Sequence, residues 1–479
     1  MAELEIYYNK TKIVATVGPA CNSREALKEL IIAGVDVFRL NFSHGTHEFH
    51  LQTINNIREL NKEMNTHVCI LQDLQGPKIR IEEVENNAID LEVGDNLIIT
   101  SDRVLGTKNK VSTTYRSLPQ DVQIGDTILI DDGNIELRVK TKNEKEVSAE
   151  VIHGGVLKSR KGINLPATTV SAPSMTEKDY EDLVFGLEND VDWIALSFVR
   201  QEEDIHELRK IIEENNKNCR IVAKIEKPEA VKNIESIISS TDAIMVARGD
   251  LGVEIPMERV PIVQKDIIKK CNLAAKPVIV ATQMLESMIQ NPRPTRAEAS
   301  DVANALMDGA DAVMLSAETA SGAYPTKAVR SMARILESVE KSTLAIYHKN
   351  YDMDTKSETF YNDRVLAGAC VIARDTCAKA ITGITFSGYT AFGLARHRPL
   401  ANIFIFTENR KLLQQLNLIW GVRGYFYDKF KSTDQSIEDT KNMLKEMGMV
   451  NVGDIMVNTG TLPVIRKQRT NMVRLTVID

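Results

Sequence analysis

The alternation of short apolar runs with amphipathic segments restricts the fold of this chain more than any other feature of its sequence. The first apolar run, residues 12–19 (KIVATVGP), is followed by helical periodicity over residues 23–34, and the same succession repeats as far as residue 76. Runs that are apolar throughout are typical of parallel strands covered on both faces. Segments with helical period between such runs are typical of crossover connections, so the sequence predicts parallel βα units.

Between residues 77 and 170 this rhythm is replaced by short strands with turn signals, such as residues 91–100 (LEVGDNLIIT). Such a pattern is typical of an all-β module. The βα rhythm returns from residue 171, so that three apolar runs precede the interruption and five follow it. Eight parallel strands predict a (β/α)8 TIM barrel, residues 1–76 and 171–349, with an inserted all-β lid domain at residues 77–170 after strand 3.

A second α/β segment follows the barrel at residues 350–479. Apolar runs such as residues 402–407 (NIFIFT) alternate there with helical segments, which predicts a smaller C-terminal α/β domain with an open, mainly parallel sheet. Three domains agree with a length of 479 residues, at about 150 residues for each domain.

Composition excludes several classes of partner. The net charge is −7, and aromatic residues make up only 5% of the chain. These values argue against a general binder of nucleic acids or anionic membranes, although a local basic pocket stays open. No apolar run approaches the roughly 18 residues of a membrane-spanning helix, and the first residues lack the apolar core of a signal peptide. The six cysteines form no Cys-x-x-Cys pair, and we expect a cytoplasmic protein.

Polar and charged residues follow most of the eight predicted strands. In a (β/α)8 barrel the catalytic groups gather at the C-terminal ends of the strands. One charged residue at a strand end is ordinary, but this many together predict a catalytic mouth for ionic ligands. In chain order the residues at these strand ends, with the small Gly249 among them, include Arg39, Asn41, Ser43, His44, Asp73, Ser197, Arg200, Lys224, Glu226, Arg248, Gly249, Asp250, Thr282 and Ser316.

Lys224 and Glu226 are the most informative pair, because residues two apart in a strand face the same side. A simple ion pair would also explain them. With Asp250 from the next strand, however, Glu226 predicts a two-carboxylate site for Mg²⁺ or Mn²⁺, completed by water and substrate oxygens. A cation, Lys224 and Arg39 together suit the transfer of a phosphoryl group. Thr282 and Ser316 could carry a proton between a substrate carbon and solvent.

Neither a zinc-spaced His/Cys cluster nor a phosphate-binding loop of the P-loop or dinucleotide type is found. Instead, long motifs resemble the pyruvate kinase family, in family order from about Lys10 to Ser342. They include FRLNFSHG, KGINLP, IVAKIEKPEA, MVARGDLGVEIP, ATQMLESM and DAVMLSAETASGAYP. The resemblance implies transfer of phosphate from phosphoenolpyruvate to ADP in glycolysis, giving ATP and, through an enolate bound to Mg²⁺, pyruvate.

The resemblance also implies roles for individual residues. Lys224 is similar to the lysine that stabilises the phosphoryl group in flight, and Glu226 and Asp250 to the Mg²⁺ ligands. The implied substrate contacts are Arg39, Lys224, Gly249, Asp250, Thr282 and Ser316, with Arg39 and Thr282 also catalytic. The implied nucleotide contacts are His44, Arg80 and Lys161, and the implied K⁺ ligands are Asn41, Ser43 and Asp73. The family is usually a cytosolic homotetramer, whose lid closes over the nucleotide.

The segment after strand three departs from the commoner family form. Many members read Asp-Thr-Lys-Gly-Pro-Glu-Ile-Arg-Thr there and need K⁺, whereas residues 73–81 of this chain read DLQGPKIRI. Lys78 replaces the glutamate, and an ammonium would repel a nearby K⁺. We expect Lys78 to stand in for K⁺, so that the enzyme does not require it. A Lys78 that simply points to solvent near the lid hinge is the alternative.

In the C-terminal domain, the turn at residues 385–390 (TFSGYT) separates a strand from a helix. Backbone N–H groups and hydroxyls at such a turn can hold a phosphate, and in the family this position resembles the pocket for a sugar-phosphate activator. Thr385, Ser387 and Thr390 are the candidate contacts, and an ordinary βα turn is the alternative. The later loop lacks the usual glycines but keeps Arg466, Lys467 and Arg469. We expect a phosphorylated effector without assigning its identity.

Two other functions stay open at this point. One is another barrel enzyme of pyruvate or phosphoenolpyruvate chemistry, such as an aldolase or a mutase, which would need neither an ADP site nor a lid. The other is a non-catalytic binding protein that keeps the fold. ADP-dependent formation of pyruvate in the presence of Mg²⁺ distinguishes both from a kinase.

Overall fold

A computed structural model describes residues 6–166, 168–342, 346–430, 432–462 and 468–479. Its central body is a closed barrel of eight parallel strands, in the spatial order β1-β16-β15-β14-β13-β12-β3-β2. The strands are β1 (Lys12–Val17), β2 (Val37–Asn41), β3 (Cys69–Asp73), β12 (Trp193–Leu196), β13 (Arg220–Ile225), β14 (Ala243–Ala247), β15 (Val278–Ala281) and β16 (Ala312–Leu315). The predicted (β/α)8 barrel, interrupted after its third strand, is confirmed.

Helices cover the outside of the barrel, and their starts follow from local sequence. Thr295, for example, caps α10 by accepting a hydrogen bond from the backbone N–H of Glu298, whose side chain bonds back to Thr295. The barrel helices are α1 (Arg24–Ile32), α2 (His47–Glu63), α4 (Glu177–Glu188), α5 (Glu202–Glu214), α6 (Pro228–Lys232), α7 (Ile234–Ser240), α8 (Arg248–Glu254), α9 (Val260–Leu273), α10 (Arg296–Asp308), α11 (Ala317–Ala320) and α12 (Pro325–Ser342).

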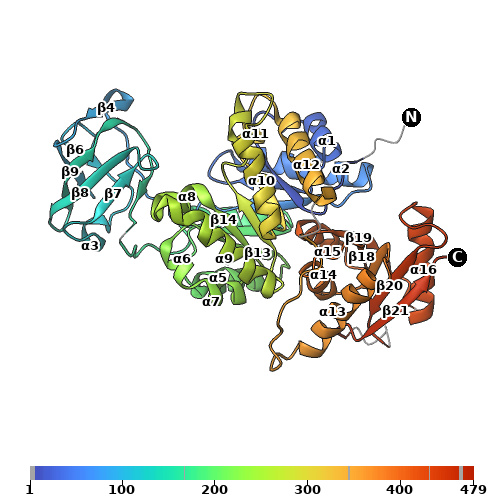
Figure 1. Ribbon diagram of the computed structural model, residues 1–479. Helices are drawn as coiled ribbons and strands as arrows, with labels where there is room; N and C mark the ends of the chain where they lie inside the picture. Colours follow the sequence, from blue (N-terminus) through green and yellow to red (C-terminus); the bar gives the residue numbers. More distant parts are fainter. Residues whose placement is uncertain (1–5, 167, 343–345, 431, 463–467) are drawn as a thin grey trace.

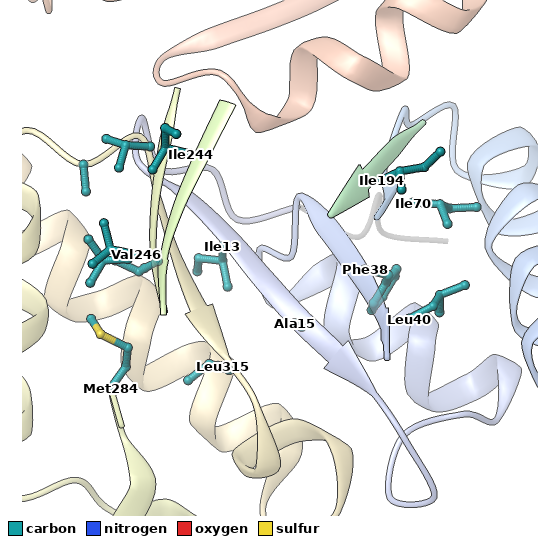
Figure 2. Packing of buried hydrophobic residues seen from close by; sticks show 14 of the residues in the cluster. Ile13, Ala15, Phe38, Leu40, Ile70, Ile194, Ile244, Val246, Met284 and Leu315 are labelled. Atoms are coloured by element: carbon teal, nitrogen blue, oxygen red, sulfur yellow. The ribbon is translucent and has the colours of Figure 1, made fainter. Parts of the chain in front are cut away.

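Alternate residues of each barrel strand enter two different apolar cores. One set packs against the surrounding helices, and Figure 2 shows part of it, including Ile13, Phe38 and Ile244. The other set fills the barrel interior and includes Val14, Trp193 and several further strand residues. Because strand side chains alternate, the residues that continue this interior set at the C-terminal strand ends also point toward the barrel axis. They lie beyond the apolar core, at the mouth of the barrel.

The segment inserted after β3 forms the lid with its own apolar core. A six-stranded sheet has the order β11-β7-β8-β9-β5-β6, and a two-stranded sheet joins β10 to β4. The strands are β4 (Ala88–Leu91), β5 (Asn96–Thr100), β6 (Lys110–Ser112), β7 (Thr127–Ile130), β8 (Ile135–Lys142), β9 (Glu146–His153), β10 (Gly155–Lys158) and β11 (Ile163–Asn164). The short helix α3 (Leu118–Asp121) is an addition to the predicted all-β module.

The C-terminal domain is an open sheet in the order β19-β18-β17-β20-β21, with only β21 antiparallel to its neighbour. Its strands are β17 (Ala380–Ile384), β18 (Asn402–Thr407), β19 (Val422–Phe426), β20 (Ile455–Gly460) and β21 (Met472–Val477). Its helices are α13 (Phe360–Asp375), α14 (Tyr389–Ala395), α15 (Arg410–Gln415) and α16 (Thr433–Glu446). The expectation of an open, mainly parallel sheet is confirmed.

The lid and the C-terminal domain lie on opposite sides of the barrel (Figure 1). The C-terminal domain contacts the N-terminal ends of the barrel strands, where the indole N–H of Trp193 donates to the carbonyl of Gln415 at 3.2 Å. This leaves the C-terminal ends of the strands facing the lid. In the described part of the chain, no helix combines the length and the apolar character needed to cross a membrane.

Candidate active site

The mouth of the barrel is formed by residues at the C-terminal strand ends that point to the same side as the interior core. Each of four polar residues lies two positions beyond an apolar residue of the interior core: Arg39 after Val37, Asp73 after Leu71, Ser197 after Ala195 and Lys224 after Val222. The period of two in a strand therefore turns all four side chains toward the same axis. This alternation of side chains explains why residues from the ends of four separate strands meet at the mouth.

Lys224 is the centre of this group. Its ammonium Nζ lies 2.7 Å from Ser197 Oγ, 3.1 Å from Asp73 Oδ1 and 3.1 Å from Glu226 Oε1. Burial alone would lower the pKa of Lys224, but the carboxylates of Asp73 and Glu226 raise that pKa well above its usual range. Lys224 is therefore a fixed positive charge at the mouth at every physiological pH.

Asp73 joins Lys224 to Arg39. The Nε of Arg39 donates to Asp73 Oδ2 at 2.6 Å, and a guanidinium NH group of Arg39 donates to Thr16 Oγ1 at 3.0 Å. Burial would raise the pKa of the Asp73 carboxyl, but the charges of Lys224 and Arg39 outweigh it and hold that pKa below its usual value. Asp73 thus orients two cations that could both face an anionic substrate.

Glu226 and Asp250 supply the carboxylates of the predicted metal site. Glu226 is almost fully buried, and its Oε2 accepts a hydrogen bond from the backbone N–H of Phe198 at 2.8 Å. Burial raises the pKa of Glu226; Lys224 opposes this shift, and the negative charge of Asp250 adds to it. Two carboxylates that repel each other in this way are suited to a hard divalent cation.

Protein side chains alone do not complete a metal site at the mouth. Among the described residues, no group of three or more His, Cys, Asp and Glu side chains could hold an ion. Mg²⁺ commonly binds through one or two carboxylates and takes its other ligands from water and substrate phosphates. Glu226 and Asp250 therefore fit a cation that binds together with a substrate.

Thr282 is held in an unusual conformation directly after β15. Its φ angle is +68°, in the left-handed region, and that of Gln283 is +54°. The Thr282 hydroxyl accepts from the backbone N–H of Gly249 at 2.8 Å and donates to the carbonyl of Ala281 at 2.6 Å. Such strain at a strand end is typical of functional sites, and the Thr282 hydroxyl contacts the backbone of Gly249 there.

Arg248 and Ser316 flank this strained turn. The guanidinium of Arg248 donates to the carbonyl of Thr282 at 2.8 Å and pairs with Asp301 at 2.7 Å. Ser316 follows β16, and its backbone N–H donates to Glu318 at 2.7 Å. The sequence places Arg248 at a strand end, directly before Gly249 and Asp250, but gives it no role of its own, because its contact with the Thr282 carbonyl depends on the neighbouring strand.

A cleft of about 670 Å³ lies between the mouth and the lid. Two predicted nucleotide contacts, His44 and Arg80, line it, and so does Arg160, which sequence reasoning did not single out. Lys161 lies beside Arg160 in the chain, but its ammonium pairs with Asp131 at 2.7 Å in the lid. The structure therefore groups two of the three predicted contacts in this cleft and turns the third toward a lid carboxylate.

The predicted monovalent-cation residues have partners within the protein. Asn41 Oδ1 accepts from the backbone N–H of Ser43 at 3.1 Å, and Asp73 is shared by Arg39 and Lys224. The Nζ of Lys78 lies 3.5 Å from Asp250 Oδ1. Lys78 therefore contacts a predicted metal ligand of the barrel and does not point only to solvent.

The turn at residues 385–390 uses its hydroxyls internally. Thr385 Oγ1 accepts from the backbone N–H of Gly388 at 3.0 Å, and Ser387 Oγ accepts from that of Tyr389 at 3.4 Å. Thr390 is buried, and its hydroxyl lies 2.7 Å from that of Thr470. Arg466 and Lys467 lie outside the described residues. The guanidinium carbon of Arg469 lies 5.8 Å from the ring centroid of Tyr389.

The chain is similar in sequence and in structure to known proteins. Residues 8–329 match the family model "Pyruvate kinase, barrel domain", and residues 363–476 match "Pyruvate kinase, alpha/beta domain". Pyruvate kinases of Staphylococcus aureus strains MRSA252 and NCTC 8325 are each 45% identical over 472 residues, which is 98% of this chain and 80% of the relative. A crystal structure of a pyruvate kinase from Cryptosporidium parvum superposes with a TM-score of 0.92 at 38% identity, covering 98% of this chain and 96% of that one.

Proposed function

The chain belongs to the pyruvate kinase family, and from this premise we propose how its own residues divide the work of the reaction. Pyruvate kinases are phosphotransferases of glycolysis that act on phosphoenolpyruvate and ADP and give pyruvate and ATP. The observation that carries our assignment is the position of Lys224, whose ammonium contacts Asp73, Ser197 and Glu226 at the barrel mouth.

We assign the stabilisation of the transferring phosphoryl group to Lys224 and Arg39. Both cations are held by Asp73 before any substrate arrives, so little reorganisation is needed as charge moves between the leaving and attacking oxygens. Transfer breaks the bond between phosphorus and the enol oxygen and forms one to the terminal oxygen of ADP. The enolate left behind then takes a proton at its methylene carbon and becomes pyruvate.

We assign the substrate cradle and the proton path to the ends of β14, β15 and β16. Gly249, Asp250, Thr282 and Ser316 are the proposed contacts. The Thr282 hydroxyl is already fixed by the Gly249 N–H and the Ala281 carbonyl. A fixed hydroxyl can pass a proton between solvent and the substrate carbon, provided that the carbon lies within hydrogen-bond reach.

Glu226 and Asp250 would hold Mg²⁺ or Mn²⁺. When bound there, the cation would supply positive charge to the phosphate and enolate oxygens. Independently of the cation, Glu226 orients Lys224, and the Phe198 N–H fixes Glu226. The family generally uses K⁺ as well, and we propose that this chain does not require it, because Lys78 places an ammonium beside Asp250. Asn41, Ser43 and Asp73 then act as scaffold.

We propose that ADP enters the cleft between the mouth and the lid. His44 and Arg80 line this cleft. Lys161 would have to leave Asp131 in order to reach a phosphate, and both residues belong to the lid. Closure of a lid over the reacting groups excludes water and so prevents transfer of the phosphoryl group to water.

We further propose a cytoplasmic homotetramer, divided into domains as predicted at residues 1–76 with 171–349, 77–170 and 350–479. Two exposed faces support self-association. A groove between α10 and α12 is lined by Ala299, Ala303 and Ile335, and β21 is an edge strand with Leu475 and Val477 exposed. Unpaired edge strands with exposed apolar residues favour pairing with another chain. Native mass spectrometry measures the oligomeric state directly.

A phosphorylated effector at Thr385, Ser387 and Thr390 remains our proposal for the C-terminal domain. Its support is the similarity of this turn to the family position. Thr385 and Ser387 accept hydrogen bonds from the backbone N–H groups of Gly388 and Tyr389, and their hydroxyl hydrogens can still donate to an effector phosphate.

The test of the overall assignment is a pyruvate-forming assay on the purified protein. We expect pyruvate from phosphoenolpyruvate only when ADP and Mg²⁺ are both present, with equimolar ATP. Pyruvate without ADP, or phosphonopyruvate as the product, would indicate another barrel enzyme. Binding of phosphoenolpyruvate without turnover would indicate a non-catalytic protein.

A further inference from the structure

A buried carboxylate joins the lid to the barrel outside the residues assigned above. Glu254, the last residue of α8, is only 4% exposed. Its Oε1 accepts hydrogen bonds from Lys227 Nζ at 2.6 Å and from Asn164 Nδ2 at 2.8 Å. Lys227 and Glu254 belong to the barrel, whereas Asn164 lies on β11 of the lid. We call these three residues the clasp.

The clasp buries polar groups at the boundary between the two domains. Glu254 Oε2 is buried and has no hydrogen-bond partner among the described residues. A buried carboxylate is costly unless its charge is paired and its oxygens are bonded. Lys227 supplies the charge, and Asn164 supplies the only lid donor to Glu254 within the described residues. The lid is therefore held to the barrel by a contact that depends on the amide group of Asn164.

The lid side of the clasp is rigidly connected to the nucleotide cleft. The segments on either side of the hinge pair with each other: Ile163 N–H donates to the Ile79 carbonyl at 2.9 Å, and Ile81 N–H donates to the Lys161 carbonyl at 2.8 Å. Arg80 lies between these two contacts and pairs with Gly162. These backbone contacts couple the position of Asn164 to the backbone of Arg80 and Lys161.

The barrel side of the clasp is connected to the metal side of the mouth. Lys227 directly follows Glu226, and Glu254 lies one helical turn after Asp250 on α8. Residues four apart in a helix lie on the same face. The clasp thus links the proposed nucleotide contacts to the proposed metal ligands through three residues to which we assign no substrate contact.

We propose that Glu254 is a positioning residue for the nucleotide: through Asn164 it sets the distance between the lid's phosphate-binding groups and the barrel mouth. This rests on the proposed assignment of ADP to the cleft. The phosphoenolpyruvate contacts all lie on the barrel, so the clasp acts on the KM for ADP and leaves the KM for phosphoenolpyruvate unchanged.

Asn164→Asp is the decisive variant. It replaces the donating amide by a second carboxylate, which faces Glu254 across a hydrogen-bond distance and repels it. The KM for ADP is expected to rise on the order of 10- to 100-fold, the range in which displaced substrate-positioning groups act. Asn109→Asp adds the same charge at an exposed lid position and is expected to leave both KM values within about twofold of the wild type.

The double variant Asn164→Asp, Glu254→Gln tests the contact itself. Lys227 and residue 164 both face the same oxygen position of residue 254. In the double variant the glutamine amide can donate to the carboxylate introduced on β11, and only one carboxylate is left beside Lys227, so the repulsion between two carboxylates is removed. We expect the KM for ADP to return to within a few-fold of the wild-type value. A residue that only supports the fold would not show this reciprocal rescue.

Circular dichroism establishes that each variant is folded, and Asn164→Ala, which removes the amide without adding a charge, replaces Asn164→Asp if the latter does not fold. A KM for ADP equal to that of Asn109→Asp would overturn the proposal, as would a double variant no better than Asn164→Asp. A wild-type protein that forms no pyruvate from phosphoenolpyruvate and ADP would instead contradict the proposed function itself.

Discussion

The ammonium of Lys78 lies 3.5 Å from Oδ1 of Asp250, on the far side of the boundary between lid and barrel. Each side chain is 30% exposed, so neither is fully removed from water. An ammonium in this place supplies positive charge beside a predicted metal ligand. A second cation such as K⁺ would be repelled there by about a kcal/mol or more.

This contact predicts an enzyme that works without K⁺. Turnover is expected to be nearly the same in K⁺ and in tetramethylammonium at matched ionic strength. Lys78→Glu is expected to lower turnover, and K⁺ to restore part of it, because the carboxylate would recreate a site for the ion. Lys158→Glu, at an exposed lid lysine, is the matched control. A wild-type enzyme that is nearly inactive without K⁺ would refute this account.

Removing Asp73 is expected to destabilise the protein in a pH-dependent way. Asp73→Asn leaves Lys224 and Arg39 without their shared carboxylate, and breaking a buried ion pair costs about 3–5 kcal/mol. The pKa of Asp73 is lower in the folded chain than its ordinary value near 4. The stabilisation is therefore present above about pH 4 and is lost as the pH falls through the lower folded-state pKa.

Urea unfolding of wild type and Asp73→Asn between pH 3 and 7 measures this effect. The difference in the free energy of unfolding is expected to be largest near neutral pH and to shrink in the acid range. A difference that does not change with pH would mean that Asp73 acts through packing and not through its charge.

The metal assignment predicts a changed requirement for Mg²⁺. Glu226→Gln removes a buried negative charge, so the Mg²⁺ concentration for half-maximal activity is expected to rise. We expect a change on the order of 10- to 100-fold or more, since even indirect partners of metal ligands contribute that much. Glu258→Gln, at an exposed position shortly before α9, is the control. An unchanged Mg²⁺ requirement in Glu226→Gln would remove Glu226 from the site.

Sequence reasoning could predict the fold and the main charges of the site because both follow from periodicity. The period of two places Lys224 and Glu226 on one face, and it also accounts for Ser197 and Thr16, whose roles become visible only when neighbouring strands are aligned. The strand order could be predicted for the same reason, since eight βα units close in only one common way.

What could not be predicted depends on side-chain direction and on backbone strain. Lys161 turns toward Asp131, a lid residue 30 positions earlier, and no local pattern indicates that choice. The left-handed conformation of Thr282 is equally invisible in a residue that rarely adopts it. The contact between Asn164 and Glu254 joins two domains across 90 positions, so it required the assembled structure.

The effector proposal predicts a response to phosphorylated metabolites. Sugar phosphates and AMP, titrated at subsaturating phosphoenolpyruvate, are expected to change the cooperativity or the KM for that substrate. Ser387→Asp places a negative charge at the turn and is expected to abolish the response by repelling phosphate. No response to any of these compounds, together with a silent Ser387→Asp variant, would identify residues 385–390 as an ordinary turn.

The most direct test of the account is the turnover of Lys224→Met with phosphoenolpyruvate, ADP and Mg²⁺. Removing one preorganised charge of this kind lowers turnover on the order of 10²–10³-fold. We expect that loss with the fold and Mn²⁺ binding retained, and an unchanged rate for Lys232→Met, which removes an exposed lysine nearby in the chain. Retention of more than about a tenth of the wild-type turnover would contradict the central role given to Lys224.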